Sequence, residues 1–372
     1  MENKDSIAEV KPRKKRRSIR RTVIILCAVL VLIAVVLPMA VSAIVYETVF
    51  GERYTTDAFY AFSLSDFPGL QAERYTFLSD SGQTLVGYRY YREDQSPKAV
   101  VVMAHGLGGG GHRSDLDAAN FFASNGLTVF AYDATGNDES EGSGVKGIPQ
   151  GVIDLDHAIS FVGQHADFAG LPVVLYGHSW GAYSVCAVLN CHPEVKAVVS
   201  LSGFSRPSDL IEVQGKTLVG GAIKLLMPYV KLWEKVKFGK YAGYTGMDGF
   251  AASNALVMVV HSTDDTTVPI EYGYDIYHEA YADSPRFQFV RFDDRNHNHI
   301  ARSDRYLAYL NDVNAQYADA RKQYGAASMT TEEQAQFRAD WLSENYDRNE
   351  YINGINTELY QQMLALFDAA LQ

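Results

Sequence analysis

Short apolar runs alternate with amphipathic segments along most of the 372-residue chain. The apolar runs lie at 99–105, 127–133, 172–178, 196–202, 255–261 and 287–292. The segments between them show the periodicity of helices. Strands that are apolar on both faces and alternate with helices are typical of a parallel sheet covered on both sides. The pattern therefore predicts an α/β fold with its functional groups at the carboxyl ends of the strands.

A hairpin is predicted before the first of these runs. Residues 74–91, RYTFLSDSGQTLVGYRYY, hold two β-rich stretches around Asp80-Ser81-Gly82. Turn residues between two such stretches favour an antiparallel pair of strands.

The N-terminal region has a different pattern, a basic block followed by a long apolar run. Residues 1–21 hold nine Lys or Arg, and residues 22–45 hold no charge. About 20 apolar residues suffice to cross a bilayer, so residues 22–45 are predicted to be a transmembrane signal-anchor. The positive-inside rule then puts residues 1–21 in the cytoplasm and the folded part outside it. A secreted form is the alternative, because Val41-Ser42-Ala43 resembles a signal-peptide cleavage site.

The whole chain has 47% apolar and 21% charged residues, a composition typical of a globular protein. The basic block has a charge of +6, nine basic against three acidic residues, which leaves −17 for the rest of the total of −11. Because an apolar run adjoins that block, we expect a membrane and no nucleic acid as its partner. Three cysteines are too few for a disulfide framework, and no metal-ligand spacing occurs, so no metal is predicted.

A candidate nucleophile lies in the sequence Gly177-His178-Ser179-Trp180-Gly181. It follows the apolar run 172–178 and precedes a helical pattern, the setting in which G-x-S-x-G forms a nucleophile elbow. The two glycines leave room where strand and helix cross. Ser179 is therefore predicted to attack, provided that a base, an orienting acid and oxyanion donors lie nearby.

Candidates for the acid and the base follow the last two apolar runs. Asp264 and Asp265 come after the run at 255–261, and His297 and His299 come after the run at 287–292. The carboxyl ends of parallel strands meet at one edge, so one residue of each pair is expected near Ser179.

Oxyanion donors are expected from two backbone amides. The glycine-rich stretch HGLGGGG follows the run at 99–105, and Leu107 is its candidate donor. The amide of Trp180, directly after Ser179, is the second candidate. The spacing fits no phosphate-binding glycine motif.

Five motifs, HGLGG, YDATGNDESEG, GHSWG, HSTDDTTVP and NHNHI, follow one another within residues 73–302. Together they resemble the α/β-hydrolase superfamily, most closely its serine aminopeptidase and monoglyceride-lipase-like branch. The branch has H-G-x-x-D-x-x-V-P at its acid loop, which implies Asp265 as the acid although Ser262 replaces the glycine. Its Asn-His pair after the last strand implies His297 as the base. The resemblance thus implies a Ser179, Asp265 and His297 triad that needs no cofactor.

Asp133, Asp138 and Glu139 in YDATGNDESEG form a group of carboxylates, of the kind that metal sites and acid–base chemistry use. The favoured interpretation is local hydrogen bonding that shapes the loop.

Residues 205–250 separate two apolar runs, and the resemblance implies that they form a small helical cap over the active site. Apolar residues recur there at the spacing of an amphipathic helix, from Ile223 to Trp233. The residues expected to line an acyl pocket are Leu226, Met227, Val230 and Trp233. Packing against the core is the alternative for the same side chains.

The predicted domains are a connector at 46–72 and a hydrolase domain at 73–372. Within that domain, residues 303–350 are expected to be a helical insertion, with a capping box from Thr330 to Glu333. Residues 356–371 resemble the closing helix of the family.

The sequence therefore predicts an α/β-hydrolase with an N-terminal transmembrane helix. Its expected function is to cleave ester, thioester or amide bonds of a small-molecule or lipid acyl substrate through an acyl-enzyme. Two alternatives remain, an acyltransferase that uses the same triad and a non-catalytic binding module that keeps only the fold.

Overall fold

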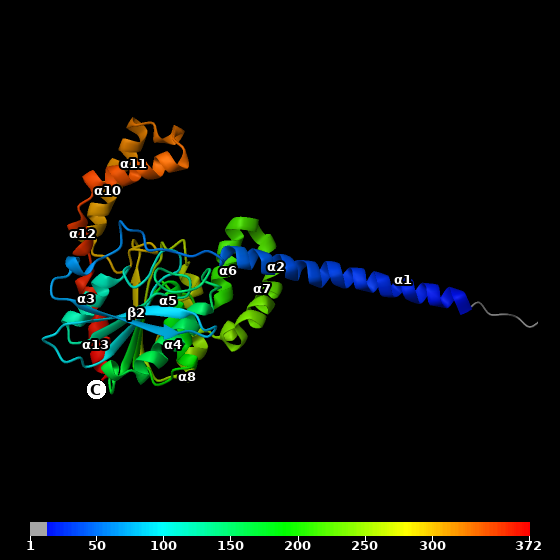
Figure 1. Ribbon diagram of the computed structural model, residues 1–372, viewed down its shortest axis with the longest axis horizontal. Helices are drawn as coiled ribbons and strands as arrows, with labels where there is room; N and C mark the ends of the chain where they lie inside the picture. The colour runs from blue at the N-terminus through cyan, green and yellow to red at the C-terminus, as the bar shows by residue number, and fades with distance from the viewer. Residues whose placement is uncertain (1–12) are drawn as a thin grey trace, which may run out of the picture.

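The computed structural model describes residues 13–372 and contains an eight-stranded sheet (Figure 1). Its strands are β1 (Gln71–Leu78), β2 (Thr84–Tyr91), β3 (Val100–Ala104), β4 (Thr128–Tyr132), β5 (Val173–His178), β6 (Ala197–Leu201), β7 (Leu256–Ser262) and β8 (Phe287–Phe292). Their order is β1-β2-β4-β3-β5-β6-β7-β8. β2 is antiparallel to both of its neighbours, β1 and β4, and strands β3 to β8 are parallel to one another. Each predicted apolar run forms a strand, and the hairpin is present, so the predicted α/β fold is confirmed.

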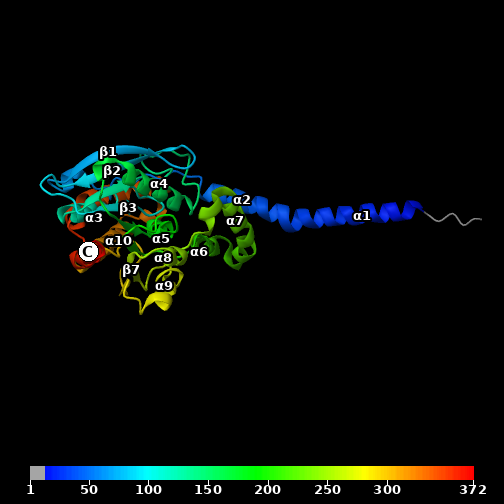
Figure 2. The ribbon, with the colours of Figure 1, turned by 90° about the horizontal axis from the view of Figure 1, so that it is seen from below.

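Helices cover both faces of the sheet because alternate residues of each central strand point to opposite sides. In β3, Val100 and Val102 belong to one core cluster, while Val101 and Met103 belong to another. The first cluster includes residues of α4 (Gln150–Gln164), α5 (Trp180–Ala187), α8 (Gly246–Ala252) and α9 (Tyr274–Tyr281). The second includes residues of α3 (Leu116–Ser124) and α13 (Thr357–Ala370), the expected closing helix. Figure 2 shows the sheet between these layers.

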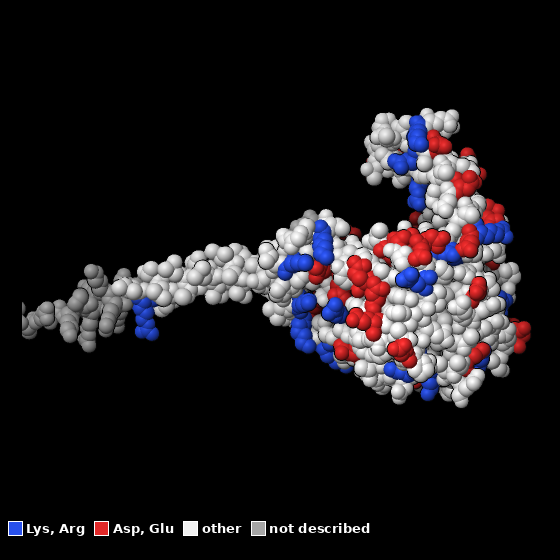
Figure 3. Space-filling model, turned by 180° about the vertical axis from the view of Figure 1, so that it is seen from behind, with Lys and Arg blue, Asp and Glu red and all other residues white. Residues whose placement is uncertain are grey.

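A long apolar helix projects from this domain (Figures 1 and 2). It consists of α1 (Arg13–Val31), a π-helical segment (Leu32–Val36) and α2 (Leu37–Val49). The part Ile19–Val49 is long and apolar enough to span a membrane, a form that an N-terminal export signal shares. Figure 3 shows no charged side chain between its basic end and the domain. Residues 1–12 of the predicted basic segment lie outside the described part of the chain.

The helix continues into the segment expected to be a connector and ends at Val49. The following residues pack on the domain rather than hang free. The amide of Tyr54 donates to the carbonyl of Gly136 at 3.0 Å, and the Phe62 side chain is fully buried.

Two groups of helices are added to the sheet domain. Residues 205–250 form α6 (Pro207–Val219), α7 (Ile223–Phe238) and α8, and α7 contains the predicted amphipathic pattern. α7 lies across α2 at the end of the domain from which α1 projects (Figures 1 and 2). Residues 303–350 form α10 (Asp304–Gln323), α11 (Thr331–Asn345) and the start of α12 (Arg348–Ile352). The predicted capping box is present at Thr330, where α11 begins.

Candidate active site

The turn between β5 and α5 places Ser179 at the carboxyl edge of the sheet. Ser179 has φ 55° and ψ −115°, a region that favours glycine. A Cβ on Gly177 would lie 2.4 Å from the carbonyl oxygen of Gly181, and one on Gly181 would lie 1.9 Å from that of Ala104. Both glycines are therefore needed sterically, and the packed strand and helix hold the strained serine in place.

His297 lies between Ser179 and Asp265. Its Nε2 is 2.8 Å from Ser179 Oγ, and its Nδ1 is 2.7 Å from Asp265 Oδ2. Because an ionised carboxylate only accepts, Nδ1 carries the proton, and Nε2 accepts from the serine hydroxyl. Ser179 is 9% exposed, Asp265 3% and His297 4%. The structure thus brings these three predicted residues into a buried chain of hydrogen bonds with the order of a nucleophile, a base and an orienting acid.

Hydrogen bonds keep Asp265 ionised despite its burial. Its Oδ1 accepts from the amides of Thr267 and Val268, each at 2.9 Å. Its Oδ2 lies 3.2 Å from Nε2 of His261, in addition to the contact with His297. Burial by itself would raise the pKa of Asp265, but these donors hold that pKa below its usual range. A charged carboxylate in this position stabilises the imidazolium that forms when the base takes a proton.

The two candidate oxyanion donors are free to bind a ligand. Leu107 lines the cavity that contains Ser179, and Trp180 is the first residue of α5. Neither amide donates to another residue within the described part of the chain. His105 fixes the glycine loop, because its Nε2 accepts from the amide of Ala134 at 3.0 Å and its Nδ1 donates to the carbonyl of Gly106 at 2.7 Å. Free amides on fixed backbone next to a nucleophile suit a developing oxyanion.

Asp264 and His299, the other members of the two candidate pairs, lie elsewhere. Asp264 Oδ1 accepts from Ser262 Oγ at 2.5 Å and from the amide of Asn296 at 2.8 Å. Asn296 Oδ1 in turn accepts from the amide of His297 at 2.6 Å. Asp264 therefore joins the acid loop to the base loop, a positioning role that sequence reasoning missed. His299 lines a neighbouring cavity, where burial and nearby Arg302 lower its pKa.

His178 holds the backbone of His297 in place. Its Nε2 donates to the carbonyl of His297 at 2.9 Å. Burial and the neighbouring His297 lower the pKa of His178 to about 4, so it is neutral at pH 7. A neutral histidine here positions the backbone of His297 without adding charge to the site.

The cavity around Ser179 has a volume of about 430 Å³. Its lining includes the glycine loop, Thr267 and Val268, and two residues of α6, Leu210 and Gln214. Sequence reasoning missed these two, although Arg206-Pro207 marks the start of a helix that carries them on one face.

The expectation that α7 lines this cavity is wrong. Leu226, Met227, Val230 and Trp233 are absent from its lining. The indole Nε1 of Trp233 instead donates to Glu47 Oε1 at 2.9 Å, and Val230 packs in the core. α7 packs against the apolar helix, a surface that lies far from residues 205–250 in the sequence.

One acidic group, Asp115, also lines the cavity. Burial and the neighbouring Asp117 raise the pKa of Asp115 to about 7, whereas Asp117 is paired with Arg302 at 2.8 Å. A carboxyl with this pKa is only partly ionised at neutral pH, so it brings less negative charge to the cavity than an ordinary aspartate does.

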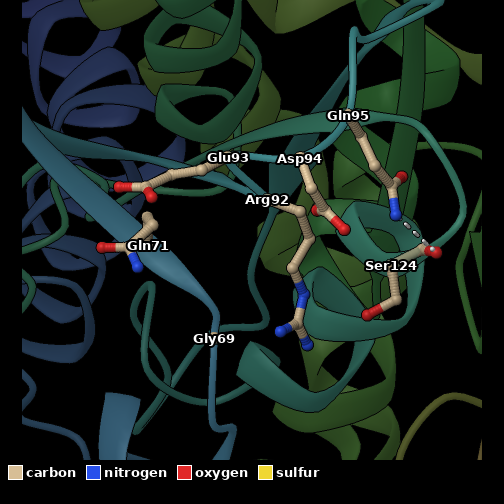
Figure 4. Close-up of a pocket in the computed structure, with 7 residues that line it drawn as sticks. All are labelled: Gly69, Gln71, Arg92, Glu93, Asp94, Gln95 and Ser124. Atoms are coloured by element: carbon tan, nitrogen blue, oxygen red, sulfur yellow. Dashed lines mark hydrogen bonds between the residues drawn. The ribbon is translucent and has the colours of Figure 1, made fainter.

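Another cavity, of about 450 Å³, lies away from Ser179 (Figure 4). It is lined by Gly69, Gln71, Arg92, Glu93, Asp94, Gln95 and Ser124. The side-chain amide of Gln95 donates to the carbonyl of Ser124 at 3.3 Å. No histidine is among these lining residues, so the cavity does not hold the Ser-His pair found at Ser179.

The carboxylates of the loop after β4 are hydrogen-bonded, but mainly to distant segments of the chain rather than locally as expected. One bond lies within the loop, from the amide of Glu139 to Asp133 Oδ2 at 3.2 Å. Asp133 Oδ1 contacts His112 Nδ1 at 2.8 Å, and Asp138 accepts from the amide of Thr56 at 2.7 Å. Glu139 accepts from the hydroxyl of Tyr88 at 2.6 Å. His112, Asp133 and Glu139 each bring a potential metal ligand within 4.8 Å of the others, but each already has a protein partner.

Comparisons with known proteins agree with this architecture. The family model described as serine aminopeptidase S33 matches residues 95–257, which include Ser179 and end before Asp265. Human monoglyceride lipase is 28% identical over 150 residues, covering 39% of this chain and 48% of the lipase. A monoglyceride lipase homolog of monkeypox virus is 33% identical over 99 residues, covering 25% of this chain and 34% of the homolog.

The alignments thus span about half or less of the length of these curated relatives. Among solved structures, the esterase Pf2001 of Pyrococcus furiosus aligns with a TM-score of 0.51 at 14% identity, covering 73% of this chain and 98% of the esterase. At that identity the similarity concerns the fold.

Proposed function

We propose that the protein is a serine hydrolase that cleaves carboxylic esters. Its chain has the α/β-hydrolase fold and resembles the monoglyceride-lipase-like branch of that superfamily. The observation that carries the proposal is the buried chain of hydrogen bonds from Ser179 through His297 to Asp265. The free amides of Leu107 and Trp180 beside that chain support it.

In the proposed reaction, Ser179 Oγ attacks the acyl carbonyl carbon while its proton passes to His297 Nε2. The carbonyl oxygen becomes an oxyanion, which accepts hydrogen bonds from the amides of Leu107 and Trp180. His297 then gives its proton to the leaving alcohol as the carbon–oxygen bond breaks. Water then attacks the acyl carbon and gives a proton to His297 Nε2. His297 returns this proton to Ser179 Oγ as the bond between Oγ and the acyl carbon breaks and the acid leaves. Asp265 orients the imidazole and stabilises its positive charge throughout.

The proposed substrate is a neutral ester with an aliphatic acyl chain. The printed names of the relatives, monoglyceride lipase and esterase, favour an ester. Leu210 and Val268 give the cavity an apolar part, and the raised pKa of Asp115 limits its charge. The family name serine aminopeptidase makes an amide the second substrate class to test.

We further propose that the protein is held in a membrane by a single span within residues 22–45, with its N-terminus in the cytoplasm. The apolar helix Ile19–Val49 supports a span, and the basic residues before it support the orientation. Extraction of membranes at high pH should leave the full-length chain in the pellet. Protease added outside intact cells should digest the domain, and a soluble form that begins at Ile44 would show cleavage instead.

A fluorophosphonate probe tests the proposed chemistry directly. It should label the full-length protein at Ser179, and Ser179→Ala should abolish the labelling. A folded protein that does not react would support a non-catalytic binding module. Turnover of p-nitrophenyl esters beside aminoacyl-anilides then separates esterase from amidase, and added alcohols or amines reveal acyl transfer to an acceptor other than water.

A further inference from the structure

α7 has apolar side chains on two opposite faces. Ile223, Met227 and Val230 lie on the buried face. Leu225, Leu232 and Val236 are 76%, 51% and 67% exposed. A helix turns by about 100° per residue, so the side chains of Leu225, Leu232 and Val236 point in directions that agree within about 40° around its axis. These directions lie opposite the buried face. We call these three residues the outer strip. Aligned aliphatic side chains on a surface mark a site of interaction with an apolar partner.

Polar contacts fix α7 to the apolar helix over a defined length. The hydroxyl of Tyr229 donates to the carbonyl of Ala34. Trp233 and Lys237 reach Glu47, with Lys237 Nζ 2.7 Å from its carboxylate. In addition, the hydroxyl of Tyr46 donates to Glu234 Oε1 at 2.9 Å in a buried contact. α7 is therefore held between the levels of Ala34 and Glu47.

Those levels bracket the expected edge of the bilayer. If the hydrocarbon core begins just after Arg21, about 20 residues cross it, and it ends near Val41. Ala34 then lies inside that boundary and Glu47 outside it. Figures 1 and 2 show α7 crossing the apolar helix rather than running along it. A helix that crosses a membrane span at this level lies in the plane of the interface, where Tyr and Trp side chains are favoured.

Charges on α7 fit the headgroup region. Lys224, Lys231 and Lys235 are exposed and lie along one flank of the outer strip. Figure 3 shows Lys and Arg side chains gathered where the apolar helix enters the domain. Lysines beside an apolar strip can extend to lipid phosphates while the aliphatic side chains enter the leaflet.

We propose that α7 is embedded in the outer face of the same bilayer that holds the span, with the outer strip among the acyl chains and the three lysines at anionic headgroups. The inference rests on the proposed membrane anchor. α7 contacts α6, which supplies Leu210 and Gln214 to the cavity around Ser179. One helix thus connects the leaflet to the catalytic cavity, and a lipid ester of that leaflet is the substrate that this arrangement favours.

An environment-sensitive probe on the outer strip tests this placement without catalysis. Leu232→Cys carries a nitrobenzoxadiazole label in the full-length protein, reconstituted in phosphatidylcholine–phosphatidylglycerol vesicles, with Cys27 and Cys191 replaced by alanine. Its emission should shift to the blue, and brominated acyl chains should quench it. Gln316→Cys on the exposed surface of α10 is the matched control and should do neither. A chain that stays in the vesicles at high pH while the label at 232 remains in water overturns the inference and leaves the anchor intact.

A substrate comparison provides the second test. The variant with Leu225, Leu232 and Val236 all changed to serine should lose at least about tenfold in kcat/KM on a long-chain ester in vesicles. It should retain its rate on a soluble acetyl ester, with active protein counted by fluorophosphonate labelling of Ser179. An equal loss on both substrates, or no loss on either, overturns the placement. Failure of the wild-type protein to label at Ser179 would instead count against the proposed function.

Discussion

The edge of the sheet and the α6–α7 cap are built from similar apolar residues, but their positions are determined differently. Strand pairing sets the edge: Ala104 pairs with Gly177, and Gly177 with Ser200, so the turn after β5 has one possible place. In the cap, α7 has apolar residues on both its buried and its exposed faces. Buried strands thus fix a site through backbone hydrogen bonds, whereas an amphipathic helix can turn toward any nearby apolar surface.

The largest expected effect comes from breaking the hydrogen-bond chain at the sheet edge. His297→Ala and Asp265→Asn should each lower kcat by several powers of ten, because the serine loses its base or the base loses its orientation. Ester hydrolysis by the purified full-length protein measures this.

The matched controls are His299→Ala and Asp264→Asn, at the neighbouring positions of the same loops. Both should have much smaller effects, since neither side chain contacts Ser179 or His297. An asparagine at 264 also keeps an oxygen that can accept from the amide of Asn296. Inactivation by His299→Ala with full activity in His297→Ala would contradict the proposed assignment.

The strained turn at the edge should be the next most sensitive point. A methyl group at Gly181 would lie 1.9 Å from the carbonyl oxygen of Ala104, so Gly181→Ala should destabilise the fold by about 1–3 kcal/mol or more. Gly163→Ala in α4 is the control, because nothing lies within 4 Å of its added Cβ, and it should stabilise by about 0.5–1 kcal/mol. Denaturant unfolding in detergent measures both, and equal effects would show that the turn is not constrained by its packing.

The cap offers a comparison between its two helices. Leu210→Ala on α6 should change how kcat/KM rises with acyl length, because each buried methylene contributes about 0.8 kcal/mol. Leu226→Ala and Trp233→Ala on α7 should instead lower the melting temperature and reduce activity on all chain lengths alike. If the dependence of kcat/KM on acyl length changed only in the α7 variants, α7 and not α6 would line the cavity.

The smallest expected effect concerns the buried contact between the cap and the apolar helix. Burial raises the pKa of Glu234 to about 7, even though the hydroxyl of Tyr46 opposes this by donating to it. An acid whose pKa is raised on folding stabilises the fold fully below its unfolded pKa, and this contribution is lost as the pH rises through the folded value.

Glu234→Gln keeps an acceptor for Tyr46 but cannot ionise. Its melting temperature should therefore exceed that of the wild type by a few degrees at pH 8 and approach it at pH 5. A difference in melting temperature that is the same at pH 5 and pH 8 would mean that folding does not raise the pKa of Glu234. Such a result would show that Glu234 does not make the stability of the protein depend on pH, but it would leave the contact between α7 and α2 unaffected.

The strands, the turn at Ser179 and the order of the motifs follow from local features of the sequence. Runs that are apolar on both faces, such as 99–105 and 172–178, became β3 and β5, because the central strands of a sheet covered on both sides are apolar on both faces. The glycines around Ser179 and the helical spacing from Ile223 to Trp233 are equally local, and both elements formed where expected.

Contacts between residues far apart in the sequence depend on how the whole chain packs. The pairing of Trp233 with Glu47, 186 residues apart, the place of Leu210 in the cavity and the link from Asp264 to Asn296 are of this kind. The motif resemblance favoured His297 and Asp265, but periodicity alone did not separate them from His299 and Asp264. Periodicity states which face of an element is apolar, whereas the surface that this face covers depends on the packing of distant segments.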